Sequence, residues 1–197
     1  MPSNNRDILV IDIETKNTFF DVGGESNLKD LDVSLACVYS YNQDRFLSFW
    51  EKDLAGLGDL LRQSRLVVGF SVSRFDLPVL DKYFNFNTRC LQRIDLLEEI
   101  ESVIGRRISL DLLAQANLNK GKTLSNGLEA IRLWNEGRHQ ELENYCLNDV
   151  RLTRDLYELA KERGYLLIPE RFSKTPIKAE FNLSEKLEAF ANENTLF

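Results

Sequence analysis

The chain has few cysteines, a single histidine and no long apolar run. Its three cysteines, Cys37, Cys90 and Cys146, are far apart in a sequence of 197 residues and form no C-x-x-C pair. This spacing supports neither a zinc site nor a Cys–His catalytic pair, and it indicates buried thiols in a reducing compartment. No segment approaches the ~20 apolar residues of a membrane span, and the N-terminus lacks a signal-peptide core. We therefore expect a cytoplasmic protein with no membrane contact.

The chain also lacks the excess of basic residues that is typical of nucleic-acid binders. It has 25 Lys and Arg against 31 Asp and Glu, which gives a formal net charge of −6. Phosphate binding usually shows as a basic surface. A negative net charge does not exclude nucleic-acid binding if several of the carboxylates hold cations, because bound cations reverse the local field. The length and the hydrophobic content of 43% predict one domain with one core.

Two carboxylates lie at the end of the first predicted strand. The apolar run of residues 8–11 passes directly into Asp12 and Glu14. Side chains two residues apart on a strand point to the same face, with roughly 7 Å between their Cα atoms. Like charges held together repel each other, and a divalent cation between them would relieve the repulsion. The alternative is that the strand ends at Asp12 and that both acids are solvated.

Two further candidate residues lie in the amphipathic pattern of residues 138–163. Apolar residues recur there at steps of three and four, and Gly164 marks the helix stop. Asp149 falls on the buried stripe, so it requires a cation, an arginine or strong hydrogen bonds. Tyr145 lies one turn earlier, with Cβ atoms about 6 Å apart, and its hydroxyl can reach the same place. The alternative is a core tyrosine beside an aspartate that only accepts a backbone hydrogen bond.

Another acid, Asp76, lies between a buried strand at 66–71 and a helix that is predicted from residue 76 onward. With Pro78 two residues later, it could serve as an ordinary helix N-cap. It could instead face the end of a neighbouring strand, where open α/β sheets keep their sites. Asp95 and Asp111 open later helices, and we interpret both as capping or first-turn acids.

The whole pattern predicts an α/β domain. Strands are expected at 7–14, 34–41, 45–50, 66–71 and 90–94, and helices at 53–63, 76–84, 95–104, 109–116, 125–136 and 138–163. We expect a catalytic domain over residues 6–164. Residues 165–197 form an extension that packs on this domain or docks a protein partner. We interpret Trp50 and Trp134 as core residues.

Three short motifs follow one another along the chain: D-x-E ending at Glu14, F-D ending at Asp76, and Y-x-x-x-D ending at Asp149. In this order they resemble the motifs of the DEDD superfamily of 3′–5′ exonucleases, in the branch with tyrosine in the third motif (DEDDy). The resemblance covers residues 7–164. The related histidine branch is disfavoured, because His139 lies ten residues before Asp149. The resemblance implies a ribonuclease H-like fold, with a mixed central sheet flanked by helices in a single domain.

The resemblance also implies a phosphodiesterase with two divalent cations, Mg²⁺ or Mn²⁺, about 4 Å apart and held by hard oxygen ligands. It implies that Asp12 bridges both ions. Glu14 and Asp149 would complete the site of the nucleophilic water, and Asp76 would support the second ion largely through waters. Tyr145 would orient the attacking water, since a phenol with an ordinary pKa near 10 is a poor base.

Candidate substrate contacts come from loops. Ser71 stands where many family members have asparagine, five residues before the second-motif aspartate, and its hydroxyl has a shorter reach. Phe19 and Phe20 follow the first motif and could stack on a terminal base or anchor their loop on the core. Lys120 and Lys122 lie in a polar connection, either as phosphate contacts or in a solvated loop.

Three functions follow as alternatives. The first is an exonuclease that removes nucleotides from the 3′ end of single-stranded DNA or RNA. The second is a phosphodiesterase for short oligonucleotides or small nucleotides. The third is a non-catalytic module that binds nucleic acid or protein, against which the four intact carboxylates argue.

Overall fold

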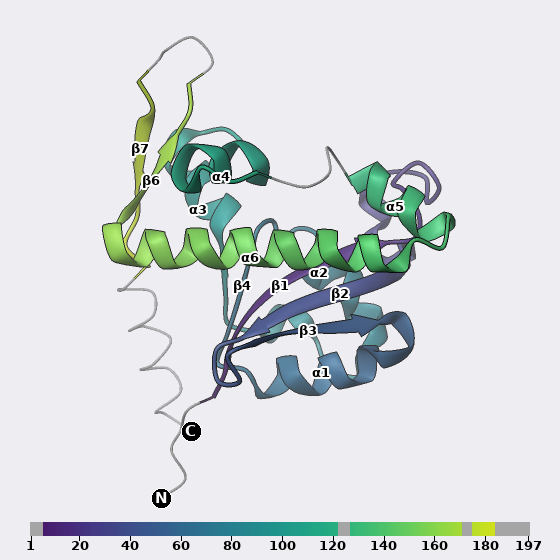
Figure 1. Ribbon diagram of the computed structural model, residues 1–197. Coiled ribbons are helices and arrows are strands. Elements are labelled where there is room, and N and C mark those ends of the chain that lie inside the picture. Colours follow the sequence, from purple (N-terminus) through teal and green to yellow (C-terminus); the bar gives the residue numbers. More distant parts are fainter. Residues whose placement is uncertain (1–5, 122–126, 171–174, 184–197) are drawn as a thin grey trace, which may run out of the picture.

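A five-stranded mixed sheet in the order β3-β2-β1-β4-β5 forms the centre of the fold (Figure 1). The computed structural model describes residues 6–121, 127–170 and 175–183. The strands of this sheet are β1 (Ile8–Thr15), β2 (Val33–Ser40), β3 (Arg45–Trp50), β4 (Leu66–Gly69) and β5 (Arg93–Asp95). β1 pairs with β2 in antiparallel orientation and with β4 in parallel orientation, so the first motif lies on the central strand.

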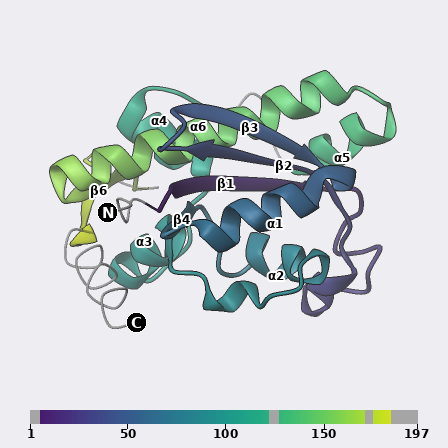
Figure 2. The ribbon, with the colours of Figure 1, turned by 90° about the horizontal axis from the view of Figure 1, so that it is seen from below.

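Helices cover both faces of this sheet. α6 crosses one face, whereas α1 and α2 lie against the other (Figures 1 and 2). The helices are α1 (Leu54–Gln63), α2 (Asp76–Leu80), α3 (Leu96–Ile104), α4 (Leu110–Leu118), α5 (Gly127–Asn135) and α6 (His139–Arg163), with short 3-10 turns η1 (Glu25–Asp30), η2 (Glu51–Asp53), η3 (Asp81–Tyr83) and η4 (Thr88–Cys90). The expected mixed sheet flanked by helices is confirmed.

The two faces of the sheet belong to two apolar clusters. On β1, Val10 packs in the cluster under α6, whereas Leu9 and Ile11 pack in the cluster on the side of α1 and α2. This alternation is what a strand with period two requires when both of its faces are covered. Asp12 and Glu14 share the parity of Val10, so their side chains lie on the face that α6 covers.

The longest helix, α6, has 25 residues and so extends about 37 Å. Its buried residues recur at steps of three and four, and they include Leu142, Tyr145 and Asp149. Gly164 follows the last turn with a φ of 75°, a left-handed conformation that glycine adopts without steric cost. The predicted helix, its end and the position of Asp149 on the buried stripe are therefore confirmed.

The chain after Gly164 forms a second, two-stranded sheet from β6 (Tyr165–Ile168) and β7 (Ile177–Glu180). The apolar pattern alone did not predict this pairing. Leu166 and Ile168 are buried in the cluster under α6. Asn117 of α4 holds the hairpin, because its amide accepts from the Leu167 backbone N–H and donates to the Leu167 carbonyl, each at 2.8 Å.

Two predicted boundaries differ from the structure by more than two residues. The strand expected at 90–94 begins only at Arg93, because side chains satisfy the preceding amides and favour a turn: Asp81 accepts from Thr88 N and Asn87 accepts from Arg89 N. The helix expected at 76–84 ends as α2 at Leu80 and continues as η3. Within the described part of the chain, no helix combines the length and apolar character that a membrane crossing requires.

Candidate active site

The first-motif acids lie side by side on the central strand, beneath α6. In register with β2, Asp12 pairs with Cys37 and Glu14 pairs with Leu35. Glu14 is 8% exposed and Asp12 is half-buried. The alternative that the strand ends at Asp12 with both acids solvated is wrong, since β1 continues to Thr15 and the helix covers this face.

The third motif places the side chains of Tyr145 and Asp149, both on α6, next to the first-motif acids. Both side chains are buried, at 3% and 2% exposure. Burial raises the pKa of Tyr145 well above its ordinary value, and the negative charges of Asp149, Glu14 and Asp12 raise it further. The phenol therefore lies close to three carboxylates and stays protonated at neutral pH, so it acts as a hydrogen-bond donor.

Asp76 reaches the same region from the connection between β4 and α2. Its carboxylate is buried and accepts a hydrogen bond of 3.1 Å from the backbone N–H of Ile13, which lies between the two first-motif acids. Burial and the charge of Asp12 raise the pKa of Asp76. The alternative of an ordinary N-cap is wrong: Phe75 occupies the N-cap position of α2, which has no side-chain cap.

Cys146 belongs to this cluster although the sequence prediction treated it only as a buried small residue. Its single S–H can donate to either of two Asp12 oxygens, the backbone carbonyl at 3.5 Å or Oδ2 at 3.6 Å from the sulfur. Burial raises the pKa of Cys146, so the thiol keeps its proton. As a hydrogen-bond donor, it helps to orient Asp12. The steps from Leu142 to Tyr145, Cys146 and Asp149 are three, four and seven, the spacing of one helix face. That spacing was the signal that could have found Cys146.

The donor set fits a hard divalent cation. Asp12, Glu14 and Cys146 each place one possible ligand atom within 4.8 Å of the other two, and Asp76 and Asp149 lie outside this set. Carboxylate oxygens are the ligands that Mg²⁺ and Mn²⁺ prefer, whereas a neutral thiol is a poor ligand for them. The effect of Asp12 on the pKa of Asp76 shows like-charge repulsion that a cation would relieve. The acidic cluster can therefore hold a cation, with carboxylates as its ligands.

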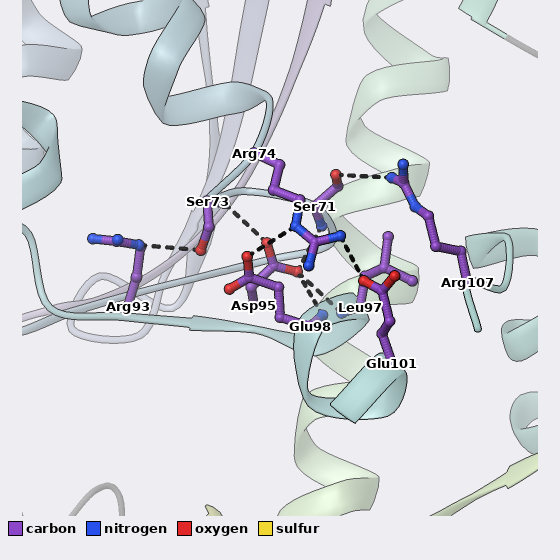
Figure 3. A network of polar contacts seen from close by, with 9 residues as sticks. All are labelled: Ser71, Ser73, Arg74, Arg93, Asp95, Leu97, Glu98, Glu101 and Arg107. Carbon is purple, nitrogen blue, oxygen red and sulfur yellow. Dashed lines mark hydrogen bonds and ion pairs between the residues drawn. The ribbon is translucent and has the colours of Figure 1, made fainter. Parts of the chain in front are cut away.

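Asp95 fixes the loop that carries the chain from β4 to Asp76 (Figure 3). Its two carboxylate oxygens accept from Ser71 N at 2.8 Å and from Ser73 N at 2.9 Å. The same carboxylate caps α3 by accepting from Leu97 N at 3.0 Å. The interpretation of Asp95 as a helix cap is confirmed, but its hold on the loop, 22 to 24 residues away in sequence, was missed.

Ser71 has a left-handed backbone with a φ of 76°. Asparagine adopts this conformation more readily than serine. The Ser71 hydroxyl accepts from Arg107 Nη2 at 3.4 Å (Figure 3). Close packing also shapes this turn, because a Cβ at Gly69 would lie 2.5 Å from the Cβ of Val72. The loop geometry therefore requires glycine at residue 69.

An apolar cavity of about 330 Å³ opens beside Glu14. Phe19 lines it, 37% exposed, with its ring edge-on to Phe75 at 5.9 Å between centroids. Leu128 of α5 also lines it. Phe20 is 92% exposed, so of the two alternatives the one in which it anchors its loop on the core is wrong. We define this space as the Phe19 cavity.

The two candidate lysines have different outcomes. The ammonium of Lys120 forms an ion pair of 3.0 Å with Asp155, which lies six residues beyond Asp149 on α6, and its side chain is 55% exposed. Lys122 lies outside the described residues. A phosphate contact at either lysine stays a prediction.

Comparison with known proteins gives a family. No curated protein sequence matches this chain. Among solved structures, it is similar to the family B DNA polymerase from the hyperthermophilic archaeon Pyrobaculum calidifontis, with a TM-score of 0.61 and 19% identity. That match covers 79% of this chain and 24% of the polymerase chain, so this chain spans about a quarter of the polymerase's length. The family model of the RNase_H superfamily matches residues 9–161. This match covers most of the sequence, and the chain therefore belongs to the RNase H superfamily.

Proposed function

We propose that this protein is a metal-dependent 3′–5′ exonuclease of the DEDDy type that hydrolyses phosphodiester bonds at the 3′ end of single-stranded DNA or RNA. One observation carries the proposal: acids from β1, from the β4–α2 connection and from α6 gather around one buried tyrosine. Membership of the RNase H superfamily supports nuclease activity, and the DNA polymerase named above makes a nucleic-acid substrate reasonable.

The residues have distinct roles in this proposal. Asp12, Glu14, Asp76 and Asp149 would hold two divalent cations, Mg²⁺ or Mn²⁺. When bound, these cations would activate a water and stabilise the attacking and leaving oxygens of an in-line displacement. Tyr145 keeps its proton, because burial and the neighbouring acids raise its pKa. Its hydroxyl therefore positions the water by donating a hydrogen bond and does not act as a base.

The Phe19 cavity suits the base of the terminal nucleotide. It lies directly beside Glu14, its volume falls within the range of small-molecule sites, and aromatic and aliphatic side chains line it. Base stacking on aromatic rings tolerates any sequence, which is what an exonuclease needs. Phe20, exposed next to this cavity in sequence, is a second candidate for stacking.

The test is hydrolysis of 5′-labelled single-stranded DNA and RNA of the same sequence, with Mg²⁺, Mn²⁺ or EDTA. We expect a metal-dependent ladder that shortens from the 3′ end and is lost in Asp12→Asn and Asp149→Asn. Glu162→Gln removes an exposed acid from the same helix and serves as the matched control. Products that shorten from the 5′ end, or equal activity in Asp12→Asn and the control, would contradict the proposal.

A phosphodiesterase for short oligonucleotides is the second candidate, because the Phe19 cavity has room for about one nucleotide. A length series from dinucleotides to octanucleotides separates the two functions. Preference for dinucleotides would favour the second candidate. Binding of single strands by a folded protein without cleavage at any length would indicate a non-catalytic module.

A further inference from the structure

A second cavity, of about 450 Å³, is lined by Trp50, Glu51, Lys52, Trp134 and His139. We define it as the tryptophan cavity. The two indole rings stack with centroids 6.3 Å apart, and the exposed His139 ring meets Trp50 edge-on at 5.4 Å. The tryptophans pack against the core cluster under α6, as expected, but they are only partly buried. Their remaining exposed surface therefore forms one aromatic wall of the cavity.

The tryptophan cavity lies on the same face of the sheet as the acidic cluster. Glu14, Leu35 and Trp50 form one cross-strand row, because Glu14 pairs with Leu35 and Leu35 pairs with Trp50. Two strand spacings separate Glu14 from Trp50 by about 10 Å. Along α6, His139 and Tyr145 are six positions apart, which corresponds to a rise of about 9 Å along the helix axis. Both measures place the cavity a few stacked nucleotides from the acids, at ~3.4 Å per nucleotide.

α5 connects the two cavities. Leu128 and Ile131 line the Phe19 cavity, and Trp134 lines the tryptophan cavity. These three residues recur every three positions, so they form one stripe along the helix. α5 and the first turn of α6 lie over the end of the sheet where β1 and β3 end (Figure 1). A ligand that enters the Phe19 cavity can thus extend along this stripe.

The charges at the tryptophan cavity suit a phosphate backbone next to a base. The ammonium of Lys16 lies 5.3 Å from the centre of the Trp134 ring and forms an ion pair of 2.5 Å with Glu51. Lys52 also lines the cavity. Two lysines against one glutamate leave a local positive charge in a chain whose net charge is −6. Aromatic rings beside lysines are the usual composition of single-strand binding surfaces.

We propose that the tryptophan cavity binds a nucleobase of the substrate strand, a few nucleotides on the 5′ side of the bond that is cleaved. This inference rests on the proposed function and adds a second contact for the strand. Stacking on the aromatic wall holds the base, and Lys16 and Lys52 contact the flanking phosphates. Strands long enough to reach the cavity therefore bind more tightly than dinucleotides, whatever their sequence.

Intrinsic fluorescence tests this directly, because Trp50 and Trp134 are the two tryptophans of the chain. We would titrate fluorescein-labelled dT8 and dT2 into the Asp12→Asn protein, so that the strand is not shortened, and record tryptophan emission and fluorescein anisotropy together. We expect dT8 to change the tryptophan emission and dT2 to bind without changing it. His139→Ala should weaken dT8 binding about 10-fold and leave dT2 binding unchanged.

Gln140→Ala, an exposed neighbour in the same turn of α6, is the matched control and should bind dT8 normally. Binding of dT8 without a change in tryptophan emission would overturn the inference, as would equal dT8 affinity in His139→Ala and Gln140→Ala, or no binding of dT8 at all. Hydrolysis by the wild-type protein is measured separately. A 3′ ladder without a tryptophan response would support the proposed function and refute the role of the tryptophan cavity in binding the strand. A tryptophan response without hydrolysis would support strand binding at the cavity and refute the proposed nuclease activity.

Discussion

Replacing Asp95 with alanine should destabilise the protein by about 3 kcal/mol. The variant loses the N-cap of α3, which is worth about 1 kcal/mol. It also leaves the amides of Ser71 and Ser73 without their acceptor, at about 1 kcal/mol each. Because the same loop leads to Asp76, we also expect weaker cation binding in this variant.

Urea unfolding followed by tryptophan fluorescence gives the free energy of unfolding, and an unchanged m-value would show that only stability has changed. Asp111→Ala is the matched control. Asp111 opens α4 as Asp95 opens α3, but it lies in the first turn while Ser109 is the N-cap, so we expect a loss below about 0.5 kcal/mol.

Asp95→Asn separates the hydrogen bonds from the charge. An asparagine keeps one acceptor oxygen and should cost about 1 kcal/mol through the lost bond to Ser73. Burial raises the pKa of Asp95 in the folded state, so the folded protein holds the proton more tightly than the unfolded chain. The wild type therefore loses stability as pH rises from about 4, and its advantage over Asp95→Asn should shrink with increasing pH. If Asp95→Ala costs less than about 1 kcal/mol, or no more than Asp111→Ala, the Asp95 carboxylate does not hold the loop between β4 and α2.

Four other substitutions and conditions test the site. Tyr145→Phe should lower kcat about 100-fold with little change in KM, and the wild-type pH–rate profile should show no step from this phenol up to about pH 9; a kcat equal to wild type would exclude the positioning role. Mg²⁺ should raise the melting temperature of the wild type and not of Asp12→Asn, as measured by calorimetry, and equal shifts would place the cation elsewhere. In EDTA at about pH 8, Asp76→Asn should have a higher melting temperature than the wild type, because the raised pKa of Asp76 makes its ionisation costly in the folded state. The difference in melting temperature should vanish near pH 4, where the carboxyl is protonated. A difference that does not change with pH would refute this cause. Ser71→Asn should raise the melting temperature by about 2 °C by relieving the left-handed strain, and a lower value would show that the Arg107 contact matters more.

Regular periodicity made the core of the fold and the positions of most acids of the candidate site predictable. The stripe along residues 138–163 placed Tyr145 and Asp149 on the buried face of α6, and the period of two in β1 placed Asp12 and Glu14 together. These are local signals, because each depends on residues within a few positions of one another. They are strong in long elements, where many residues repeat the same pattern.

The features that sequence did not reveal depend on contacts between distant segments. Asp95 holds a loop more than 20 residues upstream, and its side chain looks like an ordinary cap in sequence. Trp50 and Trp134 were correctly expected to pack on the core, but the cavity that they line needs a strand, a 3-10 turn and two helices to come together. The hairpin of β6 and β7 pairs segments too short for a periodic signal.

α6 has a consequence for how this chain can vary in length. Its first turn contributes His139, its middle contributes Tyr145, Cys146 and Asp149, and its last turns pack against β6. One inserted residue between Tyr145 and Asp149 would turn everything beyond it by about 100° and lift it by 1.5 Å, so the carboxylate would leave the face that meets β1. Related sequences should therefore differ in length in the loop before β2 or in the connection between β6 and β7, and hold the spacing inside this helix constant.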